Sequence, residues 1–325
     1  MTGDRAYRAE IAPVPDGVPR PVWSVMIPTY NAGDYLAQCL RSVLAQDPGP
    51  QAMQIEVVDD HSTVGDAQAL VRELGDGRVE LFRQPVNRGL IGNLATCIQR
   101  ARGEIVHLLH DDDFVYNGFY EHLERGFASS AAVGAACCRH IYVEPDGNWL
   151  SISPLEARRP GVIEDWLVRI ASRQRLVTPA VVVKREVYEH LGAFDSRMTW
   201  AGEDWEMWVR IAASHTIWYE PAPLAAYRTR PDSNTGRHFR LAGELGYNRK
   251  AITMFGSYLP ADRAPSIMRT ARRTYARTAL SNARDFAREG DAQAVRAHLR
   301  AALRFSRSPR VLLQAARLLA GSARP

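Results

Sequence analysis

Short apolar runs alternate with amphipathic segments in the first third of the chain. The apolar runs cover residues 22–27, 55–58, 79–82 and 105–109, and runs of this length between turn-forming residues are typical of buried strands. Between them, segments 34–46, 66–74 and 93–101 repeat apolar residues at helical spacing. Because parallel strands need a crossover connection, this order predicts an α/β fold with a Rossmann-like, mostly parallel sheet flanked by helices.

The rest of the chain follows a less regular pattern that ends in helices. Residues 131–142 and 180–183 resemble strands, and a short helix is predicted over 185–191, with Gly192 ending it. A further helix, 203–213, starts with two acidic residues. Beyond Gly236 the periodicity is entirely helical, over 268–289, 292–305 and 308–319. This predicts a C-terminal α-helical bundle of three antiparallel helices.

Polar clusters follow three of the predicted strands, at residues 29–31, 59–60 and 111–113. Ligands of open parallel sheets bind outside the carboxyl ends of the strands. Three consecutive aspartates, 111–113, would repel one another without a compensating cation. Mg²⁺ and Mn²⁺ take carboxylate oxygens together with substrate phosphates. The triplet therefore indicates a metal site at this sheet edge, with a solvated acidic turn as the alternative.

Charge is distributed unevenly along the 325 residues, which suffice for one large or two ordinary domains. Residues 1–236 carry 23 Lys and Arg against 31 Asp and Glu, whereas residues 237–325 carry 18 against 5. We expect a loose, proline-rich N-terminal arm at 1–21, a sheet domain at 22–236 and a basic helical domain at 237–325. A basic tail suits an acidic domain, an anionic membrane surface or an anionic substrate. Nucleic acid is not expected, because the arginines lack interleaved aromatic residues.

Cysteine usage and hydropathy favour a cytoplasmic protein. The four cysteines show no metal-ligand spacing and lie in apolar runs, as buried thiols of a reducing compartment do. No apolar stretch has the roughly 18 to 20 residues that span a bilayer, and the N-terminus shows no signal-peptide pattern.

Between residues 22 and 236 the chain resembles the family 2 glycosyltransferases, which have a GT-A fold. Five strings in the expected order carry the resemblance: SVMIPTYNAGDYLAQCLRSVLAQ (24–46), IEVVDDHST (55–63), NRGLIGNLATCI (87–98), IVHLLHDDDFV (105–115) and LGAFDSRMTWAGEDWEMWVRI (191–211).

The resemblance implies a nucleotide-sugar donor site at three of these strings. The donor-binding positions it implies there are Pro28, Thr29, Tyr30, Asn31, Asp59, Asp60, Asn87, Arg88 and Gly89. Residues 28–31 would hold base and ribose, and one aspartate of 59–60 would contact the base. Arg88 would pair with a phosphate. From the residues alone, Asp60 could instead cap the next turn and Arg88 could be an exposed loop cation.

The aspartate triplet matches the family's D-x-D metal motif in two registers. In one register His110 stands where the first aspartate is usual and Asp112 ligates Mg²⁺ or Mn²⁺ directly. Asp113 is then a second ligand or a sugar contact, and Asp111 is a spacer among the donor-binding residues. In the other, Asp111 and Asp113 form the motif. Arg230 stands where many members have a histidine, and its guanidinium could pair with phosphate.

Glu203 and Asp204 match the family's acidic pair. By resemblance, Asp204 is the general base that deprotonates the acceptor, permitting in-line attack with inversion, and Glu203 orients it. The alternative is an ordinary acidic first helical turn. Trp200 and Trp205 would offer stacking surface to an acceptor sugar, whereas Trp208 suits core packing.

The resemblance implies a non-processive enzyme that adds one sugar, since the Q-x-x-R-W signature and the membrane helices of processive members do not occur. The acceptor could be a glycan, a lipid-linked molecule or a small molecule. The basic helices leave open a peripheral contact with the inner face of the membrane or a homodimer. Two alternatives remain at this point: a sugar-phosphate nucleotidyltransferase, and a non-catalytic assembly partner.

Overall fold

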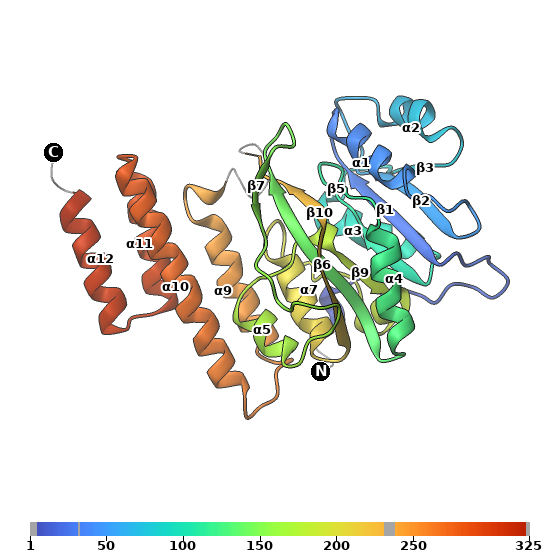
Figure 1. Cartoon of the computed structure of the whole chain (residues 1–325). Helices are drawn as coiled ribbons and strands as arrows, with labels where there is room; N and C mark the ends of the chain where they lie inside the picture. Colours follow the sequence, from blue (N-terminus) through green and yellow to red (C-terminus); the bar gives the residue numbers. More distant parts are fainter. Residues whose placement is uncertain (1–4, 32, 231–237, 323–325) are drawn as a thin grey trace. The chain divides into compact units, whose positions relative to one another are not determined.

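The computed structural model describes residues 5–31, 33–230 and 238–322, and the chain divides into two compact units (Figure 1). Unit 1 comprises Met1–Glu164, Arg175–Thr199 and Ser214–Thr229; unit 2 comprises Asp165–Gln174, Trp200–Ala213 and Arg230–Pro325. Both units combine separated segments. The three linear domains expected from the sequence therefore stay a prediction.

Unit 1 is built on one sheet with the strand order β3-β2-β1-β4-β9-β6-β10-β5. The strands of this path are β1 (Trp23–Thr29), β2 (Met53–Asp59), β3 (Glu80–Arg83), β4 (Ile105–Leu108), β5 (Phe114–Val115), β6 (Val133–Val143), β9 (Val181–Lys184) and β10 (Thr216–Arg228). The pairs β1–β2, β2–β3, β1–β4 and β6–β10 are parallel, while β9 is antiparallel to both β4 and β6. The predicted mostly parallel sheet is confirmed.

Three further pairings complete the sheet. β5 pairs antiparallel with the end of β10, β7 (Trp149–Ile152) pairs with β6, and β8 (Gly161–Val162) pairs with β10. The sequence pattern did not reveal β10. Pro221 and Pro223 interrupt its apolar run, and the β6–β10 register shifts at this point. Proline removes a ladder donor, so it is tolerated in a strand mainly at such irregularities.

The helices of unit 1 are amphipathic and flank the sheet. They are α1 (Tyr35–Leu44), α2 (Ala67–Gly75), α3 (Gly89–Arg100), α4 (Phe119–Ser129) and α6 (Arg185–Leu191). In α1, Leu36, Leu40 and Val43 are spaced along one face and join the buried core beneath the strands. Asp66 caps α2, since its carboxylate accepts from the backbone N–H of Ala69 at 2.8 Å.

The described part of the N-terminal arm is held in place, which corrects the expectation that it is loose. A 3-10 turn, η1 (Arg5–Tyr7), precedes an isolated bridge between Arg8 and Asp195. Ile11 is buried, and the backbone N–H of Ala193 donates to the carbonyl of Ala9 at 3.0 Å. The prolines suggested an unattached segment, but they still allow an extended chain to be anchored by long-range contacts.

Unit 2 is helical. Its helices are α5 (Trp166–Ser172), α7 (Glu203–Ala212), α9 (Gly243–Phe255), α10 (Ala264–Arg288), α11 (Ala292–Phe305) and α12 (Pro309–Ser322). The last three correspond to the helices expected beyond Gly236, and they pack against one another (Figure 1). Asp291 starts α11 by accepting from the backbone N–H of Ala294 at 3.0 Å.

Within the ranges that the structure describes, no helix combines the length and the apolar character needed to cross a bilayer.

Candidate active site

The carboxyl ends of β1 and β2 are joined by hydrogen bonds, and the predicted donor residues of both strands meet there. The backbone N–H of Asp60 donates to the carbonyl of Thr29 at 2.9 Å. Asn31, with a φ of 56°, donates its N–H to Ser62 Oγ at 2.9 Å and accepts at Oδ1 from Val64 N at 3.0 Å. Asn is among the few residues that tolerate this left-handed backbone.

Asp59 and Asp60 have different hydrogen-bond partners. Asp59 Oδ1 accepts from the backbone N–H of Ser62 at 2.9 Å, and Oδ2 pairs with the guanidinium of Arg83. Asp60 Oδ1 accepts from the backbone N–H of Arg88 at 2.7 Å, and burial raises the pKa of this carboxyl. Asp60 therefore anchors the start of α3. Ser62 and Arg83 are neighbours of this edge that the sequence reasoning did not single out.

The predicted segment 87–89 also lies at this edge. Asn87 donates from Nδ2 to the carbonyl of Asp60 at 3.0 Å, and its Oδ1 accepts from the backbone N–H of Gly89 at 3.0 Å. The guanidinium of Arg88 lies 3.4 Å from Thr96 Oγ1, on its own helix. Its proposed pairing with phosphate stays a prediction.

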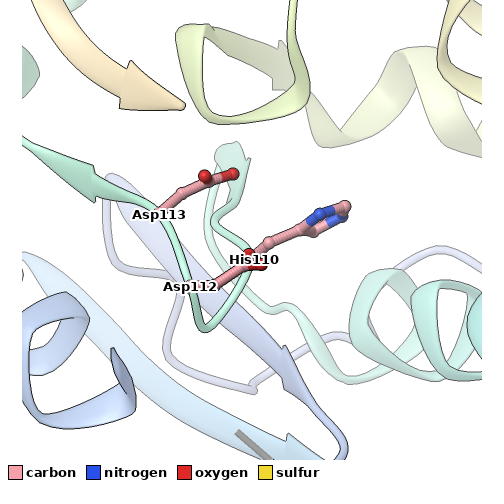
Figure 2. A group of neighbouring side chains, drawn as sticks. All are labelled: His110, Asp112 and Asp113. Carbon is pink, nitrogen blue, oxygen red and sulfur yellow. The ribbon is translucent and has the colours of Figure 1, made fainter. Parts of the chain in front are cut away.

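The aspartate triplet forms the turn between β4 and β5 (Figure 2). One potential ligand atom each from His110, Asp112 and Asp113 lies within 4.8 Å of the other two. Asp111 instead accepts from the backbone N–H of Tyr30 at 3.3 Å, which ties the turn to the end of β1. This arrangement favours the register with Asp112 and Asp113 as ligands and adds His110, which the sequence placed only at the position of a missing aspartate.

Asp113 carries the strongest indication of a cation. Its side chain is only 1% exposed, and among the described residues Oδ2 has no hydrogen-bond partner. Burial and the neighbouring Asp112 raise its pKa well above the usual range, because desolvation and like charge both oppose ionisation. Burial also lowers the pKa of His110, which leaves its imidazole neutral.

These three residues fit a divalent ion. A buried carboxylate oxygen without a partner is costly, and a bound cation reverses that cost. Two carboxylates suit Mg²⁺ and Mn²⁺ alike, and an imidazole ligand favours a transition-metal ion over Mg²⁺.

Arg228 lies at the end of β10 and is only 3% exposed. It contacts the turn that carries Asp112 and Asp113. Its backbone N–H donates to Asp113 Oδ1 at 2.9 Å, and its Nε donates to the carbonyl of Asp112 at 2.8 Å. The guanidinium also donates to the carbonyl of Pro145 at 2.6 Å and to Gln38 of α1. Sequence reasoning assigned Arg228 no role, although it stands with Arg230 in a segment, 227–233, that resembles a family motif.

The acidic pair of unit 2 opens α7. Gly202 precedes it with a φ of 73°, a left-handed conformation that glycine adopts without strain. Asp204 Oδ2 accepts from Gln174 Nε2 at 2.7 Å, and Oδ1 accepts from the backbone N–H of Trp205 at 2.7 Å. The sequence did not single out Gln174, because nothing local to it indicates the partner.

The two carboxyls of this pair titrate apart. Burial raises the pKa of Asp204 to about 6. Burial and the charge of Asp204 raise the pKa of Glu203 to about 8, and Glu203 is only 8% exposed. At neutral pH, Asp204 is therefore largely ionised while Glu203 holds its proton. Neighbouring carboxyls with separated pKa values are the pattern expected of an acid–base site.

The two tryptophans expected to meet the acceptor lie in different surroundings. Trp200 is half-buried; its ring stacks on His238 with centroids 3.9 Å apart and meets Tyr247 edge-on at 4.6 Å. Its acceptor role stays a prediction. The acceptor role of Trp205 is wrong, since it has 0% exposure, and its Nε1 donates to the carbonyl of Ile170 at 2.6 Å. A fully buried ring offers no face to a sugar.

Arg230 lies two residues beyond β10, is half-buried, and belongs to unit 2. Its pairing with phosphate stays a prediction.

A sequence model of the family described as "Glycosyl transferase family 2" matches residues 24–192. The chain belongs to this family. The protein is thus a glycosyltransferase, which sets aside the nucleotidyltransferase and the non-catalytic partner considered from the sequence. The matched region includes the predicted donor-binding residues at the ends of β1 and β2 and the turn that carries the three aspartates. It ends before Glu203.

A relative of this glycosyltransferase is distant in sequence, and two solved structures share its fold at lower identity. An uncharacterised protein of Mycobacterium tuberculosis is 27% identical over 229 residues, which cover 67% of this chain and 70% of the relative. The solved structure of S. aureus TarS 1-349 in complex with UDP-GlcNAc is 16% identical and has a TM-score of 0.63. The match covers 92% of this chain and 88% of the TarS chain. The mannosyltransferase PcManGT from Pyrobaculum calidifontis, in complex with GDP-Man and Mn²⁺, is 20% identical with a TM-score of 0.57, over 97% and 83% of the two chains. The glycosyltransferase has the GT-A fold that the sequence predicts.

Proposed function

We propose that this glycosyltransferase transfers a single sugar from a UDP- or other NDP-sugar to an acceptor hydroxyl, with inversion and with a divalent metal, and that Asp204 is the general base. The observation that carries the proposal is the buried acidic pair at the start of α7, in which Asp204 accepts from Gln174 Nε2 at 2.7 Å and burial raises the pKa of both carboxyls. It provides an ionised carboxylate next to a protonated one at neutral pH.

Unit 1 would bind the donor. A small hollow beside the ends of β1 and β2 is lined by Thr29, Ser62, Leu36 and Leu70, among others. His110, Asp112 and Asp113 would hold Mg²⁺ or Mn²⁺. Such an ion supplies electrostatic stabilisation of the diphosphate as it leaves.

Unit 2 would activate the acceptor. Ionised Asp204 would accept the proton of the acceptor hydroxyl, so that the oxygen attacks the anomeric carbon in line with the departing diphosphate. The new bond then forms on the face opposite the leaving group, and the anomeric configuration inverts. Protonated Glu203, as a hydrogen-bond donor, would orient either the base or the acceptor.

The basic C-terminal helices bear on the acceptor and on the cellular location. The excess of arginine beyond residue 236 suits an anionic or lipid-linked acceptor at a membrane surface, and the same helices could join two copies. We propose a cytoplasmic enzyme with a peripheral contact at the inner face of the membrane. A glycan or a small-molecule acceptor fits the same chemistry.

The decisive experiment combines Asp204→Asn with a panel of nucleotides and nucleotide sugars, with and without Mn²⁺. The panel, read by thermal shift, identifies the donor that stabilises the protein. With that donor, Asp204→Asn should lose at least about 10³-fold in turnover and keep the wild-type thermal shift. Near wild-type turnover by the variant would contradict the role of Asp204 as base, and a donor shift independent of Mn²⁺ would contradict the metal role.

A further inference from the structure

Gln174 connects the acidic pair of α7 to the C-terminal helices. It follows α5, and its side chain donates to Asp204 Oδ2 at 2.7 Å. Its backbone N–H donates to the phenol oxygen of Tyr275 on α10 at 3.3 Å. Gln174 thus contacts both the proposed base and a helix that begins 90 residues further along the chain than Gln174 itself. All three residues belong to unit 2.

An aromatic cluster joins the same helices around Trp205, the residue after the base. The ring of Tyr275 lies 5.0 Å from that of Trp205 and stacks on Phe305 of α11 at 5.7 Å. Phe255 of α9 meets Trp205 edge-on at 5.0 Å. Burial of large rings supplies much of the packing energy of such a cluster. Side chains from α9 and α10 therefore pack against the start of α7, and Phe305 of α11 packs against Tyr275.

We propose that α10 and α11 form part of the catalytic apparatus by holding the base in place, with Gln174 and Tyr275 as positioning residues for Asp204. This rests on the proposed function, in which Asp204 is the base. The proposal gives a role to the buried face of α10, which carries Tyr275. The net positive charge of the C-terminal region concerns only its exposed arginines.

The two faces of α10 support this division. Tyr275 is buried together with a row of small residues, Ala271, Ala276 and Ala279, while Arg272 and Arg277 are exposed. Small side chains allow close approach of neighbouring helices, so the inward face is suited to packing. The arginines remain available to solvent or to an anionic surface.

The hydrogen bond from Gln174 has a chemical consequence. A neutral amide that donates to a carboxylate favours its ionised form, and accordingly Gln174 lowers the pKa of Asp204 against the larger opposite effect of burial. It also fixes the rotation of the carboxylate. The phenol oxygen of Tyr275 accepts from the backbone N–H of Gln174. This bond fixes the backbone position of Gln174, and with it the position of the side-chain amide that donates to Asp204.

The test uses the full chain with Gln174→Leu and Tyr275→Phe, and it measures turnover as a function of pH. Gln174→Leu should move the acidic limb of the profile to higher pH and lower kcat about tenfold at pH 6.5, with the donor KM unchanged. Tyr275→Phe retains the ring and should give a smaller shift in the same direction.

Tyr258→Phe is the matched control. It removes a phenol of the same unit that donates to Glu206 Oε1 at 2.8 Å, and it should leave the pH profile unchanged. Equal loss of turnover at every pH in Gln174→Leu and Tyr275→Phe, or profiles like that of the control, would overturn the proposal. Should Gln174→Leu fail to fold, the profiles of Tyr275→Phe and Tyr258→Phe decide the matter.

The outcome is distinguishable from failure of the proposed function. If Asp204→Asn remains active, the base assignment fails. If Asp204→Asn is inactive while Gln174→Leu and Tyr275→Phe keep the wild-type profile, only the positioning role of α10 and α11 fails.

Discussion

The backbone N–H of Arg228 donates to Asp113 Oδ1 at 2.9 Å, across 115 positions of the sequence. This bond occupies one carboxylate oxygen, while Oδ2 is buried and has no hydrogen-bond partner among the described residues. The same arginine holds the carbonyl of Asp112 through Nε. The end of β10 thus fixes the orientation of the turn that carries the candidate metal ligands Asp112 and Asp113.

Replacing the Arg228 side chain leaves its backbone bond to Asp113 in place but removes the Nε bond to the carbonyl of Asp112, and this loss should weaken metal binding. We expect Arg228→Met to lower Mn²⁺ affinity about 10- to 100-fold, the usual effect of losing a partner that orients metal ligands. Isothermal titration with MnCl₂ measures this directly. Arg185→Met is the control, because Arg185 is equally buried and donates to the carbonyls of Ala101 and Ala12 away from the turn. Equal affinity loss in both variants would show that the effect is only structural.

The three candidate ligands should differ from Asp111 in their effect on metal-dependent stability. Mn²⁺ in excess should raise the Tm of the wild type, since a ligand that binds only the folded state stabilises it. Asp112→Ala and Asp113→Ala should abolish this rise, and His110→Ala should reduce it. Asp111→Ala should keep most of it, because Asp111 faces the N–H of Tyr30. A Tm rise that survives in Asp113→Ala would exclude Asp113 as a ligand.

Turnover should depend on pH as a bell. Below about pH 6, Asp204 becomes protonated and kcat/KM should fall towards a tenfold loss per pH unit. Above about pH 8, Glu203 ionises beside Asp204, and activity should fall again. Glu203→Gln, which cannot ionise, should flatten the alkaline limb and leave the acidic limb in place. An unchanged alkaline limb in this variant would assign that limb to another group.

The same substitution should change the pH dependence of folding stability. The folded-state pKa of Glu203, about 8, exceeds its ordinary value of 4.5, so burial favours the protonated form. The stability that this form contributes is fully present below about pH 4.5 and is lost as pH rises through about 8. Urea unfolding at pH 5 and pH 9 should show Glu203→Gln gaining on the wild type at pH 9, by on the order of a few kcal/mol. An equal difference at both pH values would contradict the raised pKa.

Trp200 and Trp205 should give opposite phenotypes although they are five residues apart. Trp205→Ala removes a fully buried ring and should cost about 3 to 5 kcal/mol of folding free energy, measured by denaturant unfolding. Trp200→Ala should leave stability nearly unchanged and raise the KM for the acceptor, with the donor KM as internal control. A Trp200 variant with normal acceptor KM would remove this residue from the acceptor site.

The sequence alone determined the strands of the first half and the edge at which polar residues gather. The runs at 22–27, 55–58 and 105–109 are short, apolar and separated by helical segments, and such runs can only become parallel strands whose carboxyl ends share one edge. That rule predicts that residues 29–31, 59–60 and 111–113 lie at the same edge of the sheet. It needed only local periodicity and a general property of parallel sheets.

The tertiary structure alone decided which side chains support those clusters. Arg228 reaches the aspartate turn across more than one hundred residues, and Gln174 reaches Asp204 across 30. Sequence spacing identifies neither partner, because a long-range hydrogen bond depends on packing. Burial is decided in the same way. It separates Trp205, which the helices of unit 2 enclose, from Trp200, and it raises the pKa values of Glu203 and Asp204, since desolvation exists only once the chain has folded.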